Sequence, residues 1–449
     1  MYLTNFLNLI RPNISMTTSL SEARDSHRAN DRFLNASKRS ANAKRPGLVV
    51  VLNSAIAVGF LEGQLEYFQK RGFDVTLLSP ERRDGEWTVP EPEGVATVEV
   101  PMERKMAPLR DLASLWRLWR AMRALRPVVS NVGTPKAGLL GGIAAWLNRV
   151  PCRFYTLHGL RFETASGLKR RILIYAERLA CRFAHRVVCV SHSVREKAIA
   201  FGLTNRERTL VLGSGSCNGV DASRFAPNPK LIQRAAALRR QLGIPERAPV
   251  ILFVGRLTRD KGIPELMEAF LQLDKQFPEV RLLLAGCFEK EDPLPADIRR
   301  RLARHPHIIF AGPVQDTPSF YAAADIVVLP SHREGLPTVV LEAQAAGRPV
   351  VGAQATGIVD VVTDGETGLL FPVGDVAALT RALARLVTDK DLAGKLERAG
   401  QEQVNREFQQ VRIWDSLYRA YLQVLQKKGS LPFLTGSLKR RELVARSSD

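Results

Sequence analysis

The sequence lacks any hydrophobic run long enough to cross a membrane. Its longest nearly apolar stretch, GLLGGIAAWL at 138–147, is about half of the roughly 20 residues that a spanning helix needs. The first residues, MYLTNFLNLIRPNISM, interrupt their apolar side chains with asparagine and proline, which a signal peptide does not do. We therefore expect no transmembrane helix. Over 1–45 we expect either a disordered tail or an overlong start whose true initiator is Met16.

Cysteine is scarce, and no two cysteines have the spacing of a CxxC metal or redox motif. The odd number of cysteines and their apolar neighbours predict buried thiols in a reducing compartment, so we expect a cytoplasmic protein. The cysteines are Cys152, Cys181, Cys189, Cys217 and Cys287. No G-x-G-x-x-G motif opens either half of the chain, which argues against a nicotinamide-dependent oxidoreductase.

Acidic residues are too few to balance the basic ones. The chain has 65 Lys and Arg against 45 Asp and Glu, and its formal net charge is +20 at pH 7. Such an excess implies a polyanionic neighbour: nucleic acid, an anionic membrane surface or a phosphorylated substrate. No recognised RNA- or DNA-binding motif accompanies the charge, so we expect no nucleic-acid partner. A basic nucleic-acid-binding protein is kept as an alternative that rests on charge alone.

The sequence does contain a regular alternation of short apolar runs and amphipathic segments. The runs have the composition of buried parallel strands, as in GLVVVLNS, FDVTLLSP, CRFYTLH, APVILFVGRL and DIVVLPS. Because the pattern restarts at APVILFVGRL, we predict an α/β protein with two Rossmann-like, doubly wound domains, 46–230 and 231–410, which face each other across a cleft. A helix at 411–435 is expected to return to the N-terminal domain, and 436–449 to form a basic tail.

The second half opens with a candidate phosphate site in VGRLTRDKG, 254–262. Gly255 lets the backbone approach a ligand closely. Arg256 and Lys261 place two cations just past the carboxyl end of a predicted strand, where a diphosphate can bind. The same residues also fit a solvated basic loop.

Two glutamates stand eight positions apart in HREGLPTVVLEAQAAGRPVV, 332–351. Glu334 precedes a Gly-Leu-Pro turn, and Pro337 fits the first turn of the helix that follows. Glu342 lies about 7–8 Å beyond the start of that helix. Free backbone amides at a helix start can hold an anion, here between the two carboxylates. A nucleotide sugar has this layout of sugar, diphosphate and ribose, so the stretch predicts a nucleotide-sugar site.

Taken together, GRLTRDKG, SHREGLPTVVLEAQAAGRPVV and GIVDVVTDGETGLLFPVGD resemble the retaining, nucleotide-sugar-dependent glycosyltransferases of family 4, which have the GT-B fold. The resemblance implies that Glu334 contacts the donor hexose and that Glu342 contacts the ribose hydroxyls. It implies that Arg256 and Lys261 hold the diphosphate. The expected further donor contacts are Gly59, Gly255, Gly335, Leu336, Pro337 and Thr338.

The N-terminal half resembles bacterial enzymes of capsule, exopolysaccharide or lipid-linked glycan assembly. The segments PLRDLASLWRLWRAMRALRP, GTPKAGLLGGIAAW, YTLHGLRFE and GSGSCNGVD carry this resemblance. It implies a polyprenyl-diphosphate-linked acceptor and a role for His158 beside the transferred sugar, while Lys136 can meet an acceptor phosphate. The chain departs from the family in its first loop, AVGFLEG, which lacks a Gly-Gly pair. It also has Asn131, Val132 and Gly133 where many members place a histidine.

The predicted reaction is transfer of a hexose or N-acetylhexosamine from a UDP-sugar, with retention of the anomeric configuration. Arg256, Lys261 and the amides at 335–338 would stabilise charge on the leaving diphosphate. The only D-x-D sequence, Asp389–Asp391, lies between two helical segments and is expected to cap a helix. We therefore predict no metal ion, and no cofactor beyond the nucleotide-sugar co-substrate. A UDP-sugar 2-epimerase on the same scaffold is the alternative reaction.

Two basic helices indicate where the positive charge acts. In SLWRLWRAMRALRP, 114–127, arginines at a spacing of three form a stripe: Arg117, Arg120, Arg123 and Arg126. A second basic helix is expected at 168–183. We interpret both as resting on an anionic membrane, with Trp116 or Trp119 at the interface, so that the enzyme is peripheral at the inner face of the plasma membrane. The alternative is an ordinary amphipathic helix with solvated arginines.

Overall fold

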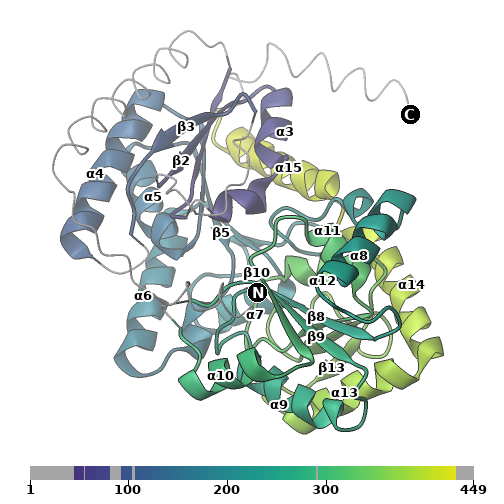
Figure 1. The fold of residues 1–449 in the computed structure, drawn as a ribbon. Helices are drawn as coiled ribbons and strands as arrows, with labels where there is room; N and C mark the ends of the chain where they lie inside the picture. Colours follow the sequence, from purple (N-terminus) through teal and green to yellow (C-terminus); the bar gives the residue numbers. More distant parts are fainter. Residues whose placement is uncertain (1–44, 55, 81–92, 104–106, 290–291, 431–449) are drawn as a thin grey trace, which may run out of the picture.

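The computed structural model describes residues 45–54, 56–80, 93–103, 107–289 and 292–430. The predicted N-terminal tail lies outside these residues except for Arg45, and the predicted basic tail lies outside them entirely. The described residues form two α/β domains, each built on its own parallel sheet (Figure 1). Among them, no helix combines the length and apolar character that crossing a bilayer requires.

The N-terminal domain is built on a seven-stranded sheet with the order β3-β2-β1-β4-β5-β6-β7, in which every pairing is parallel. Its strands are β1 (Gly47–Val51), β2 (Asp74–Ser79), β3 (Ala96–Glu99), β4 (Val129–Gly133), β5 (Cys152–Leu157), β6 (Arg186–Cys189) and β7 (Thr209–Leu210). Its helices are η1 (Ile56–Leu61), α3 (Gln64–Lys70), α4 (Pro108–Leu125), α5 (Pro135–Leu147), η2 (Arg161–Thr164), α6 (Gly167–Phe183) and α7 (His192–Ala200), whereas η3 (Ala222–Arg224) packs into the core of the other domain.

Helices cover both faces of this sheet because successive strand residues point to opposite sides. On β1, Val49 and Val51 belong to the core under α4, α5 and α6. Leu48 and Val50 belong to the core under α3 and the last helix, α15 (Gln410–Lys427). Neighbouring helices α4, α5 and α6 pack side by side on their face of the sheet (Figure 1).

The C-terminal domain has a six-stranded parallel sheet with the order β10-β9-β8-β11-β12-β13. Its strands are β8 (Val250–Val254), β9 (Arg281–Ala285), β10 (Ile308–Gly312), β11 (Ile326–Leu329), β12 (Val350–Ala353) and β13 (Leu369–Phe371). Its helices are α8 (Pro229–Gln241), α9 (Ile263–Asp274), α10 (Ala296–Arg304), α11 (Thr317–Ala323), α12 (Thr338–Ala345), α13 (Val376–Thr388) and α14 (Lys390–Glu407). The predicted pair of doubly wound parallel sheets is thus confirmed.

The chain crosses back to the N-terminal domain at its end, where α15 packs against α3 and β5 (Figure 1). Tyr421 is fully buried there, and its hydroxyl accepts a hydrogen bond from the Asn131 amide at 2.7 Å. Trp414 donates to Asn218 at 2.7 Å. Gly63 must be glycine because its φ is +77° and a Cβ would lie 2.7 Å from the Trp414 ring.

One sequence prediction about the cysteines is wrong in part. Cys152, Cys181 and Cys189 are buried and Cys217 is half-buried, but Cys287 is exposed. Cys287 comes two residues after β9 ends, where the chain has left the covered sheet. Apolar residues before a cysteine therefore predict a buried strand. They do not show whether the cysteine itself still belongs to that strand.

The two domains are joined by hydrogen bonds between η2 and α7 on one side and the segment after β12 on the other. The backbone N–H of Ser193 donates to the Asp360 carboxylate at 2.9 Å, and the Ser193 hydroxyl donates to the same carboxylate. Lys197 donates to the Thr356 hydroxyl at 2.6 Å, and that hydroxyl donates to Glu163 at 2.7 Å. We call these five residues the interdomain latch.

Candidate active site

The candidate residues gather because parallel strands bring their carboxyl ends to one edge of each sheet. His158 directly follows β5, and Lys136 lies in the first turn of α5, just after β4. Gly255 directly follows β8. Glu334 lies in the loop between β11 and α12. The two carboxyl edges meet where the domains meet, which is the position the sequence predicts for the site.

Backbone contact between the domains explains the glycine at 335. A Cβ on Gly335 would lie 1.9 Å from the carbonyl oxygen of His158. A Cβ on Gly357 would likewise lie 2.3 Å from the carbonyl oxygen of Gly335. Real side-chain carbons do not approach oxygen so closely. The loop that carries Glu334 can therefore contact the His158 loop only if residue 335 is glycine.

Lys261 and Glu334, which the sequence predicts in separate donor contacts, form an ion pair with each other. Their side chains are only 18% and 13% exposed, so the pair is largely shielded from water. Shielding strengthens the attraction between the charges, and each then needs the other unless a ligand replaces it. A donor that brings a sugar hydroxyl to Glu334 and a phosphate to Lys261 would satisfy both groups.

Arg256 lies in a wider network of charges. Its guanidinium pairs with Glu289 and lies 3.9 Å from the carboxylate of Asp260. Arg333, which sequence reasoning did not assign, binds the same Asp260 at 3.0 Å and also donates to the Thr164 hydroxyl of η2 at 2.9 Å. Arg333 directly precedes Glu334 in the HREG loop, and that position was the signal that could have revealed it.

Glu342 has a partner within the protein. Helix α12 begins at Thr338, with Pro337 as the residue before it, one position later than the sequence prediction. The Tyr321 hydroxyl donates a hydrogen bond to Glu342 Oε2 at 2.8 Å. Burial raises the pKa of Glu342 to about 7. The sequence explanation, that a ribose alone makes this carboxylate tolerable, is therefore incomplete, because Tyr321 already binds one of its oxygens.

His158 is half-buried beneath Phe60, with ring centroids 6.4 Å apart. Burial lowers the pKa of His158 to about 4, so its imidazole is neutral near pH 7. Around this ring a small cavity of about 20 Å³ is lined by polar side chains as well as apolar ones, including Gln64, Asn131 and Thr156. A neutral imidazole beside such groups can accept or donate one hydrogen bond to a sugar hydroxyl.

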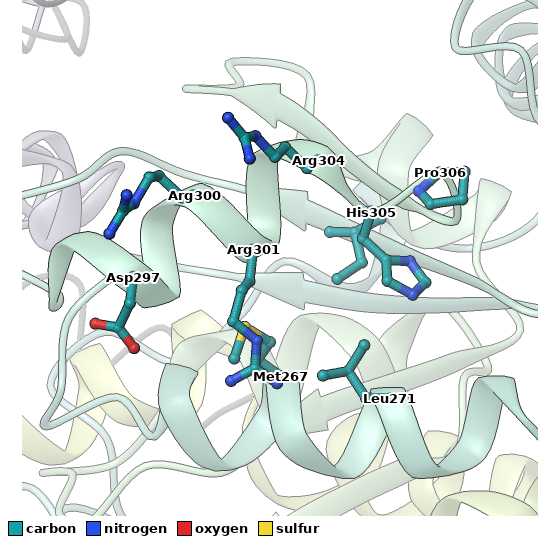
Figure 2. Close-up of a pocket in the computed structure, with 9 residues that line it drawn as sticks. Met267, Leu271, Asp297, Arg300, Arg301, Arg304, His305 and Pro306 are labelled. Atoms are coloured by element: carbon teal, nitrogen blue, oxygen red, sulfur yellow. The ribbon is translucent and has the colours of Figure 1, made fainter.

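A larger cavity, about 470 Å³ in volume, lies elsewhere, between α9 and α10. Figure 2 shows Arg301 pointing between the two helices, over Met267. Arg301 is paired with Glu268 at 2.6 Å. None of the sequence-predicted site residues lines this cavity. The size of a cavity is therefore no guide to the active site of this protein.

Comparisons with known proteins identify the family of this chain. The family model described as "Glycosyl transferases group 1" matches residues 235–403, and the "Glycosyl transferase 4-like domain" matches residues 60–215. The capsular polysaccharide biosynthesis glycosyltransferase CapM of Staphylococcus aureus is 34% identical over 381 residues, which cover 85% of this chain and 97% of CapM. The chain belongs to the group 1 glycosyltransferases.

The chain is also similar to another curated transferase and to a solved structure. An Escherichia coli α-1,3-galactosyltransferase, named for UDP-Gal and α-D-GlcNAc-diphosphoundecaprenol, is 26% identical over 333 residues, 73% of this chain and 84% of its own length. The structure of HepE from Anabaena in complex with UDP-glucose superimposes with a TM-score of 0.72 at 23% identity, covering 84% of this chain and 99% of HepE. The predicted GT-B fold is thus confirmed.

The structure shows where two further predicted ligand contacts, Gly59 and Lys136, lie. Gly59 lies within η1, where the chain adopts a helical backbone, so that loop places its left-handed glycine at Gly63 instead. Lys136, predicted to meet an acceptor phosphate, forms an ion pair at 2.7 Å with Asp111 of α4 and is 11% exposed. An acceptor phosphate would reach this lysine at the boundary between α4 and α5.

The D-x-D sequence of the transferase is a helix cap, as predicted. The Asp389 side chain accepts a hydrogen bond from the backbone N–H of Leu392 at 2.9 Å, at the start of α14. Within the described part of the chain, no group of three His, Cys, Asp or Glu side chains has the arrangement of a metal site. The predicted phosphate contacts Arg256 and Lys261 and the neighbouring Arg333 are all held in ion pairs with carboxylates at this edge of the sheet.

Proposed function

We propose that this glycosyltransferase moves a hexose or N-acetylhexosamine from a UDP-sugar to a polyprenyl-diphosphate-linked glycan, with retention of the anomeric configuration. The observation that carries the donor half is the shielded Lys261–Glu334 pair, joined to the Glu342 carboxylate by the loop and helix between them. The pair offers one cation for phosphate and one carboxylate for sugar hydroxyls. The solved structure of HepE with UDP-glucose supports a UDP-sugar as the donor.

The chain's own groups divide the chemistry as follows. Arg256, Lys261 and the first amides of α12 stabilise the negative charge that develops on the leaving diphosphate. The bond from the anomeric carbon to the phosphate oxygen breaks, and a bond to the acceptor oxygen forms on the same face. The proton of the acceptor hydroxyl passes to the departing phosphate. Neutral His158 orients a hydroxyl of the transferred sugar and excludes water.

A lipid-linked acceptor is supported by the E. coli relative, whose name specifies a diphosphoundecaprenol acceptor. In this chain, Lys136 is the proposed contact for the acceptor diphosphate. Lys136 lies close to the start of α4, because it forms an ion pair with Asp111 in the first turn of that helix. A lipid lying along that end of the domain could bring its phosphates to Lys136 and its terminal sugar to His158.

The outer surface of α4 and α6 supports peripheral attachment to an anionic membrane. On α4, Leu109, Leu112 and Trp116 are exposed at helical spacing. On α6, Leu168, Ile172 and Tyr175 form a second exposed stripe. Both stripes occupy the first half of a helix that follows the carboxyl edge of the sheet, which is the edge that carries the site. Exposed basic side chains flank them: Arg110, Arg117, Arg120, Arg123, Lys169, Arg171, Arg178 and Arg182.

Two details of the sequence interpretation change. Trp119 is half-buried and its carbonyl oxygen accepts a hydrogen bond from Asn148, so Trp116 is the tryptophan available to a membrane. Arg126 follows the end of α4 in a left-handed conformation, with φ of 45°, and does not continue the arginine stripe. The stripe ends there because the helix itself ends at Leu125.

The proposed function is tested by incubating the purified protein with a panel of UDP-sugars and short polyprenyl-diphosphate glycans. The expected product is a lipid longer by one sugar, whose new linkage has the anomeric configuration of the donor by NMR. Consumption of the UDP-sugar without lipid, giving an epimer or free sugar, would instead indicate a 2-epimerase. An inverted linkage would remove the retaining mechanism.

A further inference from the structure

The two oxygens of Glu342 have different surroundings. Oε2 accepts the hydrogen bond from Tyr321, whose side chain is 0% exposed. Within the described residues, Oε1 makes no hydrogen bond to the protein, and it is not among the buried side-chain atoms left without a partner. One oxygen is therefore held by the protein interior, while the other remains accessible.

Tyr321 is itself fixed by packing. It lies on α11, which packs along α8, and its ring meets the ring of Phe225 edge to face, with centroids 5.7 Å apart and planes at 72°. Phe225 is also buried, directly after η3. Because its ring is packed against Phe225, Tyr321 can move its hydroxyl very little. The hydrogen bond therefore fixes the rotation of the Glu342 carboxylate about the Cγ–Cδ bond.

Resting on the proposed function, we propose that Tyr321 is a positioning residue for the donor nucleotide, because it holds Oε2 so that Oε1 of Glu342 accepts the ribose hydroxyls. A glutamate without this restraint would turn freely and pay conformational entropy each time a nucleotide binds. Tyr321 should therefore raise the affinity for nucleotides that carry ribose hydroxyls and leave the affinity for nucleotides that lack them unchanged.

The charges around Glu342 give the proposal a pH signature. Burial raises the pKa of this carboxyl, and Glu62 from the loop after η1 raises it further, while the Tyr321 hydrogen bond and Arg224 of η3 lower it, for a net value of about 7. Arg224 and Glu62 are themselves paired at 2.9 Å. The ionised carboxylate is the better acceptor for ribose hydroxyls, so UDP affinity should rise with pH through about 7. Tyr321→Phe removes a group that lowers the pKa, so the midpoint should move to higher pH.

The experiment measures the dissociation constants of UDP and 2′,3′-dideoxy-UDP by calorimetry between pH 5.5 and 8.5. At pH 8 the wild-type protein should bind UDP at least about 10-fold more tightly than the dideoxy nucleotide, which is what a hydrogen bond to a charged group contributes. In Tyr321→Phe this ratio should fall below about 3-fold. Glu342→Gln should lose the ratio as well, together with its pH dependence.

A matched control exists in the other domain. Tyr155 is also fully buried and donates to a carboxylate, Glu177, at 2.6 Å. Tyr155→Phe should cost similar stability, measured by thermal unfolding, and leave the UDP to dideoxy-UDP ratio and its pH midpoint unchanged. A loss of discrimination in both variants would mean that the effect is general loosening, and would overturn the proposal.

The remaining outcomes separate this proposal from the proposed function. Wild-type protein that discriminates the two nucleotides, with a Tyr321→Phe variant that discriminates equally at every pH, overturns the role of Tyr321 alone. Wild-type protein that binds UDP with no discrimination overturns the role of Tyr321 even if the variant does not fold. Wild-type protein that does not bind UDP removes the donor assignment and this inference together.

Discussion

The Lys261 ammonium group donates a hydrogen bond to the carboxylate of Glu334, although 73 positions separate the two residues in the chain. The loops after β8 and β11 carry the two residues, and these strands are neighbours in the sheet. Without a donor the two charges neutralise each other. Under the proposed function, a nucleotide sugar would have to separate the two charges or contact both.

The first prediction concerns Glu334. Glu334→Gln should lower kcat by about 100-fold or more, because the amide can neither hold Lys261 nor accept from the donor sugar as strongly. It should also lower the melting temperature, because the change leaves the shielded Lys261 ammonium without a charged partner, but the protein should still fold. Initial rates and thermal unfolding check both statements.

A control for the first prediction is Glu279→Gln, which makes the same chemical change at an exposed turn between α9 and β9. That variant should keep full activity. If Glu334→Gln were as active as Glu279→Gln with the native donor, the assignment of Glu334 to the transferred sugar would be wrong.

Sequence reasoning predicted the fold, and it predicted which strand ends carry the candidate donor residues, because both depend on local patterns. Apolar runs at regular intervals predict parallel strands, and the strand ends then predict where Arg256 and Glu334 lie. Helix geometry alone places Glu342 inside α12. These inferences need only spacing along the chain.

The partners of those residues could not be predicted, because they come from distant segments. Tyr321 lies on a different helix from Glu342, and no periodicity connects them. Lys136 and Asp111 are 25 positions apart on two helices whose rotation is fixed only by packing. Likewise, the choice between Trp116 and Trp119 depends on which side of α4 faces the sheet, and both fit an amphipathic pattern.

The second prediction concerns the pH dependence of stability. Burial lowers the pKa values of His158 and His185 to about 4, below the ordinary value of 6.5. Between pH 4 and 6.5 the unfolded chain therefore binds more protons than the folded chain, so stability falls as the pH falls. Each histidine contributes up to about 1.4 kcal/mol per pH unit within this range.

His158→Asn and His185→Asn should both flatten the decline of melting temperature from pH 6.5 to 4.5. Only His158→Asn should reduce transfer, by about 10-fold or more, because a correctly placed hydrogen bond is lost. His185 accepts from the backbone N–H of Arg153 at the opposite edge of the sheet and should leave the rate unchanged. Equal loss of activity in the two variants would contradict a direct role for His158.

The third prediction concerns the interdomain latch. Asp360→Ala removes both hydrogen bonds that this carboxylate accepts from Ser193, whereas Ser193→Ala removes the hydroxyl bond and keeps the backbone one. Each should raise the KM for the donor several-fold, because the closed arrangement of the domains becomes less populated. The double variant should be little worse than Asp360→Ala alone, with a coupling free energy of about 0.5–3 kcal/mol. Strictly additive effects would show that the two residues act independently.

The fourth prediction concerns metal ions. The proposed function has the donor phosphates held by Arg256, Lys261 and backbone amides, so transfer should survive an excess of EDTA. Retained rates in EDTA, measured with the same enzyme after dialysis, are the expected result. Loss of activity that returns on adding Mg²⁺ or Mn²⁺ would show that a cation shares the diphosphate with these side chains.

The last prediction concerns the outer surface of α4 and α6. Leu109, Leu112 and Trp116 are 86%, 65% and 54% exposed, which is costly in water and favourable at a membrane interface. Each basic residue near an anionic surface adds about 1 kcal/mol, so several can hold the protein reversibly. Sedimentation with vesicles of varied phosphatidylglycerol content should show binding that rises with anionic lipid and falls with salt.

Two variants test the basic and the apolar residues of this surface separately, and a third controls for net charge. Replacing Arg117, Arg120 and Arg123 together by Gln should abolish the dependence on anionic lipid, whereas Trp116→Ser should weaken binding at every lipid composition. Replacing three exposed arginines of α10 by Gln, at Arg299, Arg300 and Arg304, removes the same charge from the other domain and should leave binding intact. If this control lost as much binding as the α4 variant, attraction would depend on net charge alone. The membrane would then have no preferred face on the protein, and the lipid acceptor would have no fixed route to Lys136.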